Sequence, residues 1–226
     1  MLNLRRILLR PLTSALIKPA LQRYLRTERV YRGHGLVLHV PPGVFHPGFF
    51  FSSGVMATWL AQQPLAGQHL LDVGTGSGLL GLVAARHGAE VTLLDLSPRA
   101  LLAAQRNAQR NQLRVRLAHS DGLAQLPLDA RFDWVIANPP WFAAPPPDEA
   151  GLAWYAGPQL SWFHDFFGQL ASRLSPDGRA VLVLADSADL AAIHRLAATY
   201  GWRLTTRYKR RVVWEWQHVL QATRHD

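Results

Sequence analysis

Three glycines at alternate positions, in Asp72-Val73-Gly74-Thr75-Gly76-Ser77-Gly78, constrain this chain more than any other stretch. An apolar run ends at Asp72, the glycines follow, and helix-forming residues then resume, which predicts a strand, a tight turn and a helix start. The glycines permit positive φ and lack a Cβ, so a ligand can lie directly on the loop backbone. Free amides at the helix start attract an anionic ligand group. Asp72 can hydrogen-bond a ligand ammonium group or orient the loop.

The spacing of the glycines separates two kinds of ligand site. A dinucleotide fingerprint is G-x-G-x-x-G, whereas this loop is G-x-G-x-G with Leu79 where the third glycine would fall. The spacing therefore opposes an NAD-binding oxidoreductase. Taken alone, the loop also fits a tight turn in an α/β domain of some other function.

A second predicted strand, residues 91–95, ends in Asp95, 21 positions after Gly74. In a parallel α/β sheet this acid lies beside the glycine loop, where it can accept hydrogen bonds from both hydroxyls of a ribose. Ser97 is a suitable N-cap for the next helix, and Pro98 suits its first position. The second strand therefore adds a ribose site to the glycine loop.

A third stretch, Asn138-Pro139-Pro140-Trp141, follows a predicted strand over residues 132–137. The Asn138 side-chain oxygen and the Pro139 carbonyl can accept both N–H groups of a planar amide or aromatic amine, which aims the nitrogen lone pair at an electrophile. The prolines fix φ and hold that carbonyl in place, and Trp141 offers a flat face for a planar group. A proline-terminated strand with a packing tryptophan is the purely structural alternative.

Together, these three stretches resemble class I S-adenosylmethionine (SAM) methyltransferases over about residues 44–220. The N-P-P-aromatic motif narrows the resemblance to the N-methyltransferase branch, which includes release-factor glutamine methyltransferases and enzymes that methylate exocyclic amines of adenine or guanine. The family implies SAM as the cofactor and S-adenosylhomocysteine as its product. It also implies an α/β fold with a Rossmann-like, seven-stranded mixed sheet, helices on both faces and a C-terminal antiparallel hairpin.

The resemblance assigns roles to the matching residues. The acceptor nitrogen is expected at the catalytic motif, made of Asn138, Pro139, Pro140 and Trp141. The cofactor is expected at the ends of three strands and at this motif, through Asp72, Gly74, Thr75, Gly76, Gly78, Asp95, Leu96, Asp121, Gly122 and Asn138. Of these, Asp121 is the candidate for the adenine amino group.

Composition limits the other classes of site. The chain has 226 residues and no cysteine, so it forms no disulfide and no thiolate metal site, and its ten histidines show no paired metal spacing. No apolar run approaches the roughly 18 residues of a membrane span. We therefore expect a cytoplasmic protein without a bound metal.

The net charge of +9 is concentrated at the two ends of the chain. Residues 1–32 carry eight Lys or Arg against one Glu, and residues 201–226 carry six against two acids, while the middle of the chain is close to neutral. Basic ends suit an anionic partner such as RNA, the ribosome or a membrane surface. A solvated surface without a partner explains them equally well.

We expect a basic N-terminal extension over residues 1–43, with one or two helices in 1–32 and a short strand in 35–40, before a catalytic domain over 44–226. In the helical part, leucines recur at helical spacing between arginines. Near the C-terminus we expect a helix over 159–174 and a hairpin of strands 203–208 and 212–222, turning at 209–211.

Two segments leave their roles open. Phe49-Phe50-Phe51 replaces the Glu-Asp-Thr run that closes over the cofactor in glutamine methyltransferases, so it either contacts the cofactor or plugs the sheet edge, with Ser52 or Ser53 supplying the hydroxyl. The proline-rich segment 142–158 is either a lid that selects the substrate or a surface loop.

The methyl acceptor also has two candidates. Val44-Phe45-His46-Pro47 resembles glutamine methyltransferases and favours a protein glutamine of a release factor or a ribosome-associated protein. The basic ends favour RNA, with N6 of adenine or N2 of guanine as the target. A non-catalytic SAM-binding protein is the alternative outside the enzymes.

Overall fold

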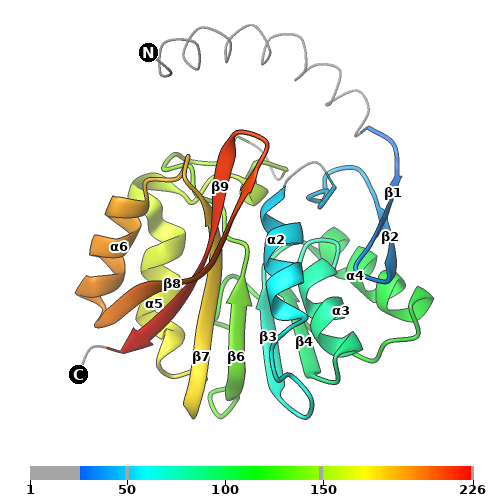
Figure 1. Cartoon of the computed structure of the whole chain (residues 1–226), viewed down its shortest axis with the longest axis horizontal. Helices are drawn as coiled ribbons and strands as arrows, with labels where there is room; N and C mark the ends of the chain where they lie inside the picture. Colours follow the sequence, from blue (N-terminus) through cyan, green and yellow to red (C-terminus); the bar gives the residue numbers. More distant parts are fainter. Residues whose placement is uncertain (1–25, 49–50, 148–149, 225–226) are drawn as a thin grey trace, which may run out of the picture.

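The computed structural model describes residues 26–48, 51–147 and 150–224 (Figure 1). The helices expected in 1–32 lie mostly outside the described residues. Within them the expectation is wrong, because Arg29–Gly33 form strand β1, which pairs antiparallel with β2, Leu36–Val40. His34 and Gly35 join the two strands with φ of 54° and 73°, a two-residue turn that matches the twist of a hairpin.

Seven strands form one mixed sheet in the order β5-β4-β3-β6-β7-β9-β8, which confirms the expected fold class. The five strands β3 (His69–Val73), β4 (Glu90–Asp95), β5 (Arg116–His119), β6 (Phe132–Ala137) and β7 (Leu174–Ala185) are parallel. The antiparallel hairpin of β8 (Trp202–Val212) and β9 (Glu215–Arg224) completes one edge. From β3, the chain adds β4 and β5 on one side and then returns to add β6 and β7 on the other side, so the strand order reverses at β3. Ligands of such sheets bind at the carboxyl ends of the strands next to this point.

Helices cover both faces of the sheet. Successive residues of a strand point to opposite faces and therefore pack against different helices. Leu70 packs with α2 (Phe51–Leu60), α3 (Leu79–Arg86) and α4 (Pro98–Arg110), whereas Leu71 packs with α5 (Ser161–Leu170) and α6 (Leu190–Thr199). In Figure 1, α2 and α3 lie beside β3 and β4, while α5 and α6 flank the β7 side of the sheet. None of the described helices is long and apolar enough to cross a membrane.

Two asparagines of the α4 region attach the β1–β2 hairpin to the domain. Asn107 Oδ1 accepts a hydrogen bond of 2.8 Å from His39 N, and its Nδ2 donates to His39 O and Ser77 O, both at 3.0 Å. Asn111 forms the same pair of bonds with Val37 N and O, at 3.0 and 2.9 Å. The edge of β2 that does not pair with β1 is thereby bonded to side chains of the α4 region.

Two elements near the C-terminus differ from the sequence expectation. The helix expected from residue 159 begins at Ser161, because Gln159 and Leu160 have left-handed φ of 54° and 63°. The last hairpin turns at residues 213–214 rather than at 209–211, because β8 continues through the basic run to Val212. The charged residues lie in the strand, since their side chains are exposed and the ladder needs only their backbone groups.

Candidate cofactor and acceptor site

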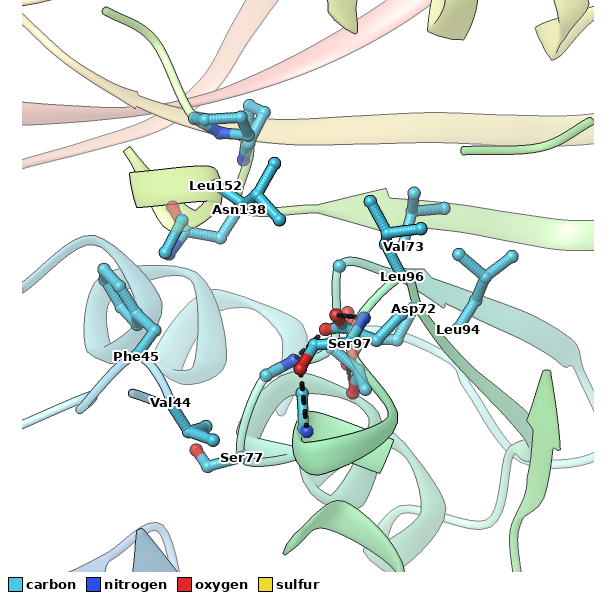
Figure 2. Close-up of a pocket in the computed structure, with 18 of the residues that line it drawn as sticks. Val44, Phe45, Asp72, Val73, Ser77, Leu94, Leu96, Ser97, Asn138 and Leu152 are labelled. Atoms are coloured by element: carbon cyan, nitrogen blue, oxygen red, sulfur yellow. Dashed lines mark hydrogen bonds between the residues drawn. The ribbon is translucent and has the colours of Figure 1, made fainter. Parts of the chain in front are cut away.

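A pocket opens at the carboxyl ends of β3, β4 and β6, where the strand order reverses (Figure 2). Asn138 and Phe45 lie on one side of it, and Asp72 and Ser97 lie on the other. Eleven of the predicted site residues border the pocket: Asp72, Gly74, Thr75, Gly76, Asp95, Leu96, Asp121, Gly122, Asn138, Pro139 and Pro140. The pocket thus brings together residues from four separate stretches of the sequence.

The glycine loop uses its three glycines differently. Gly74 and Gly76 have φ of 69° and 56° and border the pocket. A Cβ on Gly74 would meet no protein atom within 4 Å, so its backbone faces open space. Gly78, with φ of 91°, does not border the pocket, and its Cβ would stand 3.2 Å from both Ala104 and Leu82. Gly78 therefore lets α3 and α4 approach each other instead of facing a ligand.

Asp72 holds the loop in shape. Its Oδ2 accepts hydrogen bonds from Thr75 Oγ1 at 2.7 Å and from Gly81 N at 2.9 Å, and only 1% of the residue is exposed. Burial raises the pKa of Asp72 to about 6, although these two hydrogen bonds act in the opposite direction. Of the two roles that the sequence left open, the geometry assigns loop orientation; contact with a ligand ammonium group stays a prediction.

Asp95 is fixed by the backbone on both sides. Its Oδ2 accepts from Gly76 N at 2.8 Å, and its Oδ1 accepts from Ser97 N at 2.9 Å. Burial raises the pKa of Asp95, and the backbone hydrogen bonds oppose this shift. Each carboxylate oxygen retains a lone pair, so the group still has capacity to accept from a diol in the pocket.

Asp121 and Gly122 border the pocket at the end of β5. The Asp121 side chain is exposed, and the turn beneath it is closed by Ser120 Oγ, which donates to Gly122 O at 2.9 Å. Gly122 has φ of 55°, and a Cβ there would meet nothing within 4 Å. This end of the pocket therefore combines open backbone with an acceptor that a planar amine can reach.

In the Asn138 side chain, the amide nitrogen forms a hydrogen bond and the amide oxygen forms none among the described residues. Its Nδ2 donates to Ser53 Oγ of α2 at 2.9 Å, while its Oδ1 is buried and accepts no hydrogen bond within the described part of the chain. Leaving an acceptor buried and unpaired costs about 1–3 kcal/mol, so such an atom calls for a partner. Asn138 borders the pocket, where a donor group on a substrate can supply that partner.

Trp141 does not border the pocket, although the sequence placed it at the acceptor. Its ring packs against Trp154, with centroids 6.3 Å apart, and against Phe142 at 5.9 Å. Trp141 N and Phe142 N both donate to Trp154 O, at 3.0 and 2.9 Å. The tryptophan therefore anchors segment 142–158, and its role as an acceptor platform stays a prediction.

Segment 142–158 forms a wall of the pocket through its described residues, with Leu152, Ala153 and Tyr155 on the lining. Phe142 forms a bridge with Tyr155, which closes the segment on itself. The segment therefore lies at the pocket, and its role in selecting the substrate stays a prediction. Phe49 and Phe50 lie outside the described residues, and Phe51 begins α2 with 45% of its surface exposed.

Sequence reasoning missed several residues of this site. Val44 and Phe45 border the pocket, and so does Trp162 in the first turn of α5. Trp162 also stacks on Phe166, with centroids 5.0 Å apart and planes inclined by 12°. The helix expected over 159–174 gave no sign that its first turn reaches the pocket. In the described ranges, no group of three or more His, Asp or Glu side chains could hold a metal ion.

A family model described as "Methyltransferase small domain" matches residues 35–202. The chain belongs to this family. The glycine loop, Asp95 and the Asn138 motif all fall within the matched region.

Two curated relatives match shorter parts of the chain. The ribosomal protein L11 methyltransferase of Methylococcus capsulatus is 32% identical over 163 residues, which cover 70% of this chain and 48% of the relative. The release factor glutamine methyltransferase of Bordetella pertussis is 37% identical over 122 residues, 53% of this chain and 44% of the relative. The chain thus spans about half the length of these relatives.

A solved structure extends the similarity over most of the chain. The T. thermophilus 16S rRNA N2 G1207 methyltransferase, in complex with AdoMet and guanosine, superposes with a TM-score of 0.65 and 26% identity. The match covers 88% of this chain and 50% of that one. The structural similarity therefore covers more of this chain than either curated relative does.

Proposed function

We propose that this chain is a SAM-dependent N-methyltransferase that acts on a planar amide or exocyclic amino nitrogen. One observation carries the proposal: Asn138 Oδ1 is buried beside the pocket without a donor among the described residues, while Ser53 holds the other half of the amide. The site thus presents a fixed acceptor for an N–H group of a substrate.

The pocket fits the cofactor that the family uses. The open backbone at Gly74 and Gly76 can take the methionine part, Asp95 can accept from the ribose hydroxyls, and Asp121 can accept from the adenine amine. When bound, SAM supplies an electrophilic methyl group on its sulfonium sulfur.

The chain's own groups position the acceptor nitrogen. Asn138 Oδ1 and Pro139 O accept its two N–H groups, which localises the lone pair and aims it at the methyl carbon. The nitrogen–carbon bond forms as the carbon–sulfur bond breaks, and the nitrogen then loses one proton to solvent. The products are the methylated amine or amide and S-adenosylhomocysteine, so no side chain needs to act as a general base.

A protein glutamine and a nucleobase amine both fit this geometry. The relatives named above include one enzyme for release-factor glutamine and one for a guanine of 16S rRNA. Val44, Phe45 and Pro47, which carry the likeness to glutamine methyltransferases, border the pocket. Both kinds of acceptor belong to the translation machinery, and this supports the proposed cytoplasmic location.

Tritiated SAM tests the proposal with two substrate pools from a host that lacks this protein: total RNA, and protein freed of nucleic acid. We expect label in one pool, removed by nuclease if the acceptor is RNA or found in one protein band if it is a glutamine. The Asn138→Ala variant should abolish transfer and keep SAM affinity within a few-fold, because Oδ1 faces the acceptor. Equal turnover in variant and parent, or SAM binding without label in either pool, would contradict the proposal.

A further inference from the structure

The β8–β9 hairpin extends past the end of β7, on the edge of the sheet that carries the pocket. Ala185, the last residue of β7, pairs with Gln217, and the hairpin continues to the pair Val212–Glu215 and a turn at residues 213–214. Figure 1 shows this tip rising above the sheet. The tip therefore projects on the side where a substrate must approach.

The strand register gives the distance from the tip to the acceptor site. Ala137, the residue before Asn138, pairs with Leu182 of β7, which pairs with Leu220 of β9. Trp216 lies four residues from Leu220 toward the hairpin turn, a distance of about 14 Å at 3.4 Å per residue. Strand β9 lies two strands from β6, which adds a sideways distance of about 10 Å. Trp216 is thus on the order of 17 Å from the end of β6, which one short polymer segment can span.

Three consecutive cations of β8 lie where the hairpin begins to project: Lys209 and Arg210 are level with the last two residues of β7, and Arg211 lies beyond them. Lys209, Arg210 and Arg211 are all exposed, and none forms an ion pair within the described ranges. The one acid of the tip, Glu215, accepts a hydrogen bond from Gln217 Nε2 at 3.1 Å. With three cations against one acid, this end of the hairpin carries an excess of positive charge.

Two tryptophans accompany these cations. Trp214 is 74% exposed and Trp216 is 39% exposed. Lys209 Nζ lies 5.3 Å from the centre of the Trp216 ring, and Arg211 pairs with Trp216 across the ladder, so these two cations share one face of the hairpin with Trp216. Aromatic faces interleaved with cations bind single-stranded nucleic acid by stacking on bases and pairing with phosphates.

We propose that the tip of the β8–β9 hairpin holds a single-stranded segment of RNA and presents a nearby base to Asn138. This inference rests on the proposed function, whose substrate class it specifies as an exocyclic amine of an RNA base. An acidic protein would use the cations but not the exposed indole faces. A membrane surface would use both and supply no planar amine, whereas RNA provides phosphates, stacking bases and the acceptor nitrogen in one molecule.

Fluorescence anisotropy with a labelled, mixed-sequence single-stranded RNA tests this surface. The triple variant Lys209→Ala, Arg210→Ala, Arg211→Ala should weaken binding about tenfold or more, and its slope of log affinity against log salt should be shallower by about 2, since each phosphate contact on a single strand contributes about 0.7. The matched control replaces three exposed arginines on other faces, Arg114→Ala, Arg116→Ala and Arg195→Ala. This control removes the same charge and should change affinity by less than about threefold.

The single variant Trp214→Ala separates RNA from other polyanions. It should weaken RNA binding about tenfold, because stacking contributes about 1–3 kcal/mol per base, and it should leave binding of polyglutamate unchanged. Equal losses in the hairpin and control triples, or a parent without affinity for the RNA, would overturn the inference. Preference for polyglutamate or for phosphatidylglycerol vesicles over RNA would also overturn it.

Methyl transfer is measured separately, so that the two proposals can fail independently. With RNA as the acceptor, the hairpin triple should raise KM at least about tenfold and leave kcat and SAM affinity within about twofold. RNA binding at the hairpin without any methyl transfer would contradict the proposed function and leave the RNA surface standing. Label confined to protein, and unaffected by the hairpin variants, would refute the RNA assignment.

Discussion

The hydroxyl of Ser53, in the first turn of α2, accepts a 2.9 Å hydrogen bond from Asn138 Nδ2. The two residues are 85 positions apart in the sequence. The bond restrains the rotation of the Asn138 side chain, because it holds the Nδ2 half of the amide against α2. Its Oδ1 is thereby held ready for a donor in the pocket.

Ser53→Ala should therefore lower kcat about tenfold, because the Asn138 amide loses the bond that orients it. SAM affinity should change by less than about threefold, since the removed bond does not touch the cofactor pocket's acids or glycines. Ser52→Ala is the matched control: Ser52 Oγ is buried without a described partner, so removing it costs no hydrogen bond. Steady-state kinetics that show equal effects of the two substitutions would exclude the orienting role of Ser53.

Asp72→Asn should change the pH dependence of stability. Burial raises the pKa of Asp72 from its ordinary value of 3.8 to about 6, so the folded protein holds this proton more tightly than the unfolded chain. The contribution of Asp72 to stability is thus greatest below about pH 4, falls by about 3 kcal/mol as the pH rises to about 6, and is constant above. An asparagine can still accept from Thr75 and Gly81, so the variant keeps the loop and loses this dependence.

Urea denaturation of parent and Asp72→Asn between pH 4 and pH 8 measures the effect. The unfolding free energy of the variant minus that of the parent should increase from pH 4 to pH 6 and stay constant above pH 6. Parallel curves over the whole range would show that Asp72 titrates normally in the folded protein.

Gly81→Ala should destabilise the protein, although alanine favours helices. A Cβ at Gly81 would overlap Leu93 Cδ2 and stand 3.1 Å from Asp72 Oδ2, so the buried Leu93 side chain or the loop acid must shift. We expect a loss of about 1–3 kcal/mol from overpacking. Gly54→Ala in α2 is the control, because its Cβ meets nothing within 4 Å and the change should stabilise by up to about 1 kcal/mol. Thermal denaturation should give shifts of opposite sign; equal shifts would contradict the close approach of α3 to β4.

Asn107→Ala should cost about 2–4 kcal/mol, because it leaves His39 N, His39 O and Ser77 O without their side-chain partner. Gln105→Ala, on the exposed side of the same helix, removes a similar amide and should change stability by less than about 0.5 kcal/mol. Hydrogen exchange should show faster exchange of the β2 amides in Asn107→Ala alone. Unchanged protection of His39 N would indicate that other contacts hold the β1–β2 hairpin.

Sequence motifs predicted the sheet and most of the residues around the pocket. Glycine spacing, the acids at two strand ends and the Asn138 motif are local patterns, and parallel strands bring their carboxyl ends to one edge. The same patterns could not assign Gly78 to helix packing or Trp141 to the wall segment, since both depend on which neighbour occupies the space next to the residue.

The three motifs, read along the chain, carried the family resemblance, which implied the fold class, and the predicted strands gave the positions of Asp72, Asp95 and Asn138. Only the tertiary structure decided that Ser53 meets Asn138, that Asn107 ties β2 to the glycine loop, and that Lys209 of β8 lies against Trp216 near the hairpin tip. Local propensity acts over a few residues, whereas these contacts join segments that become neighbours only when the sheet is complete.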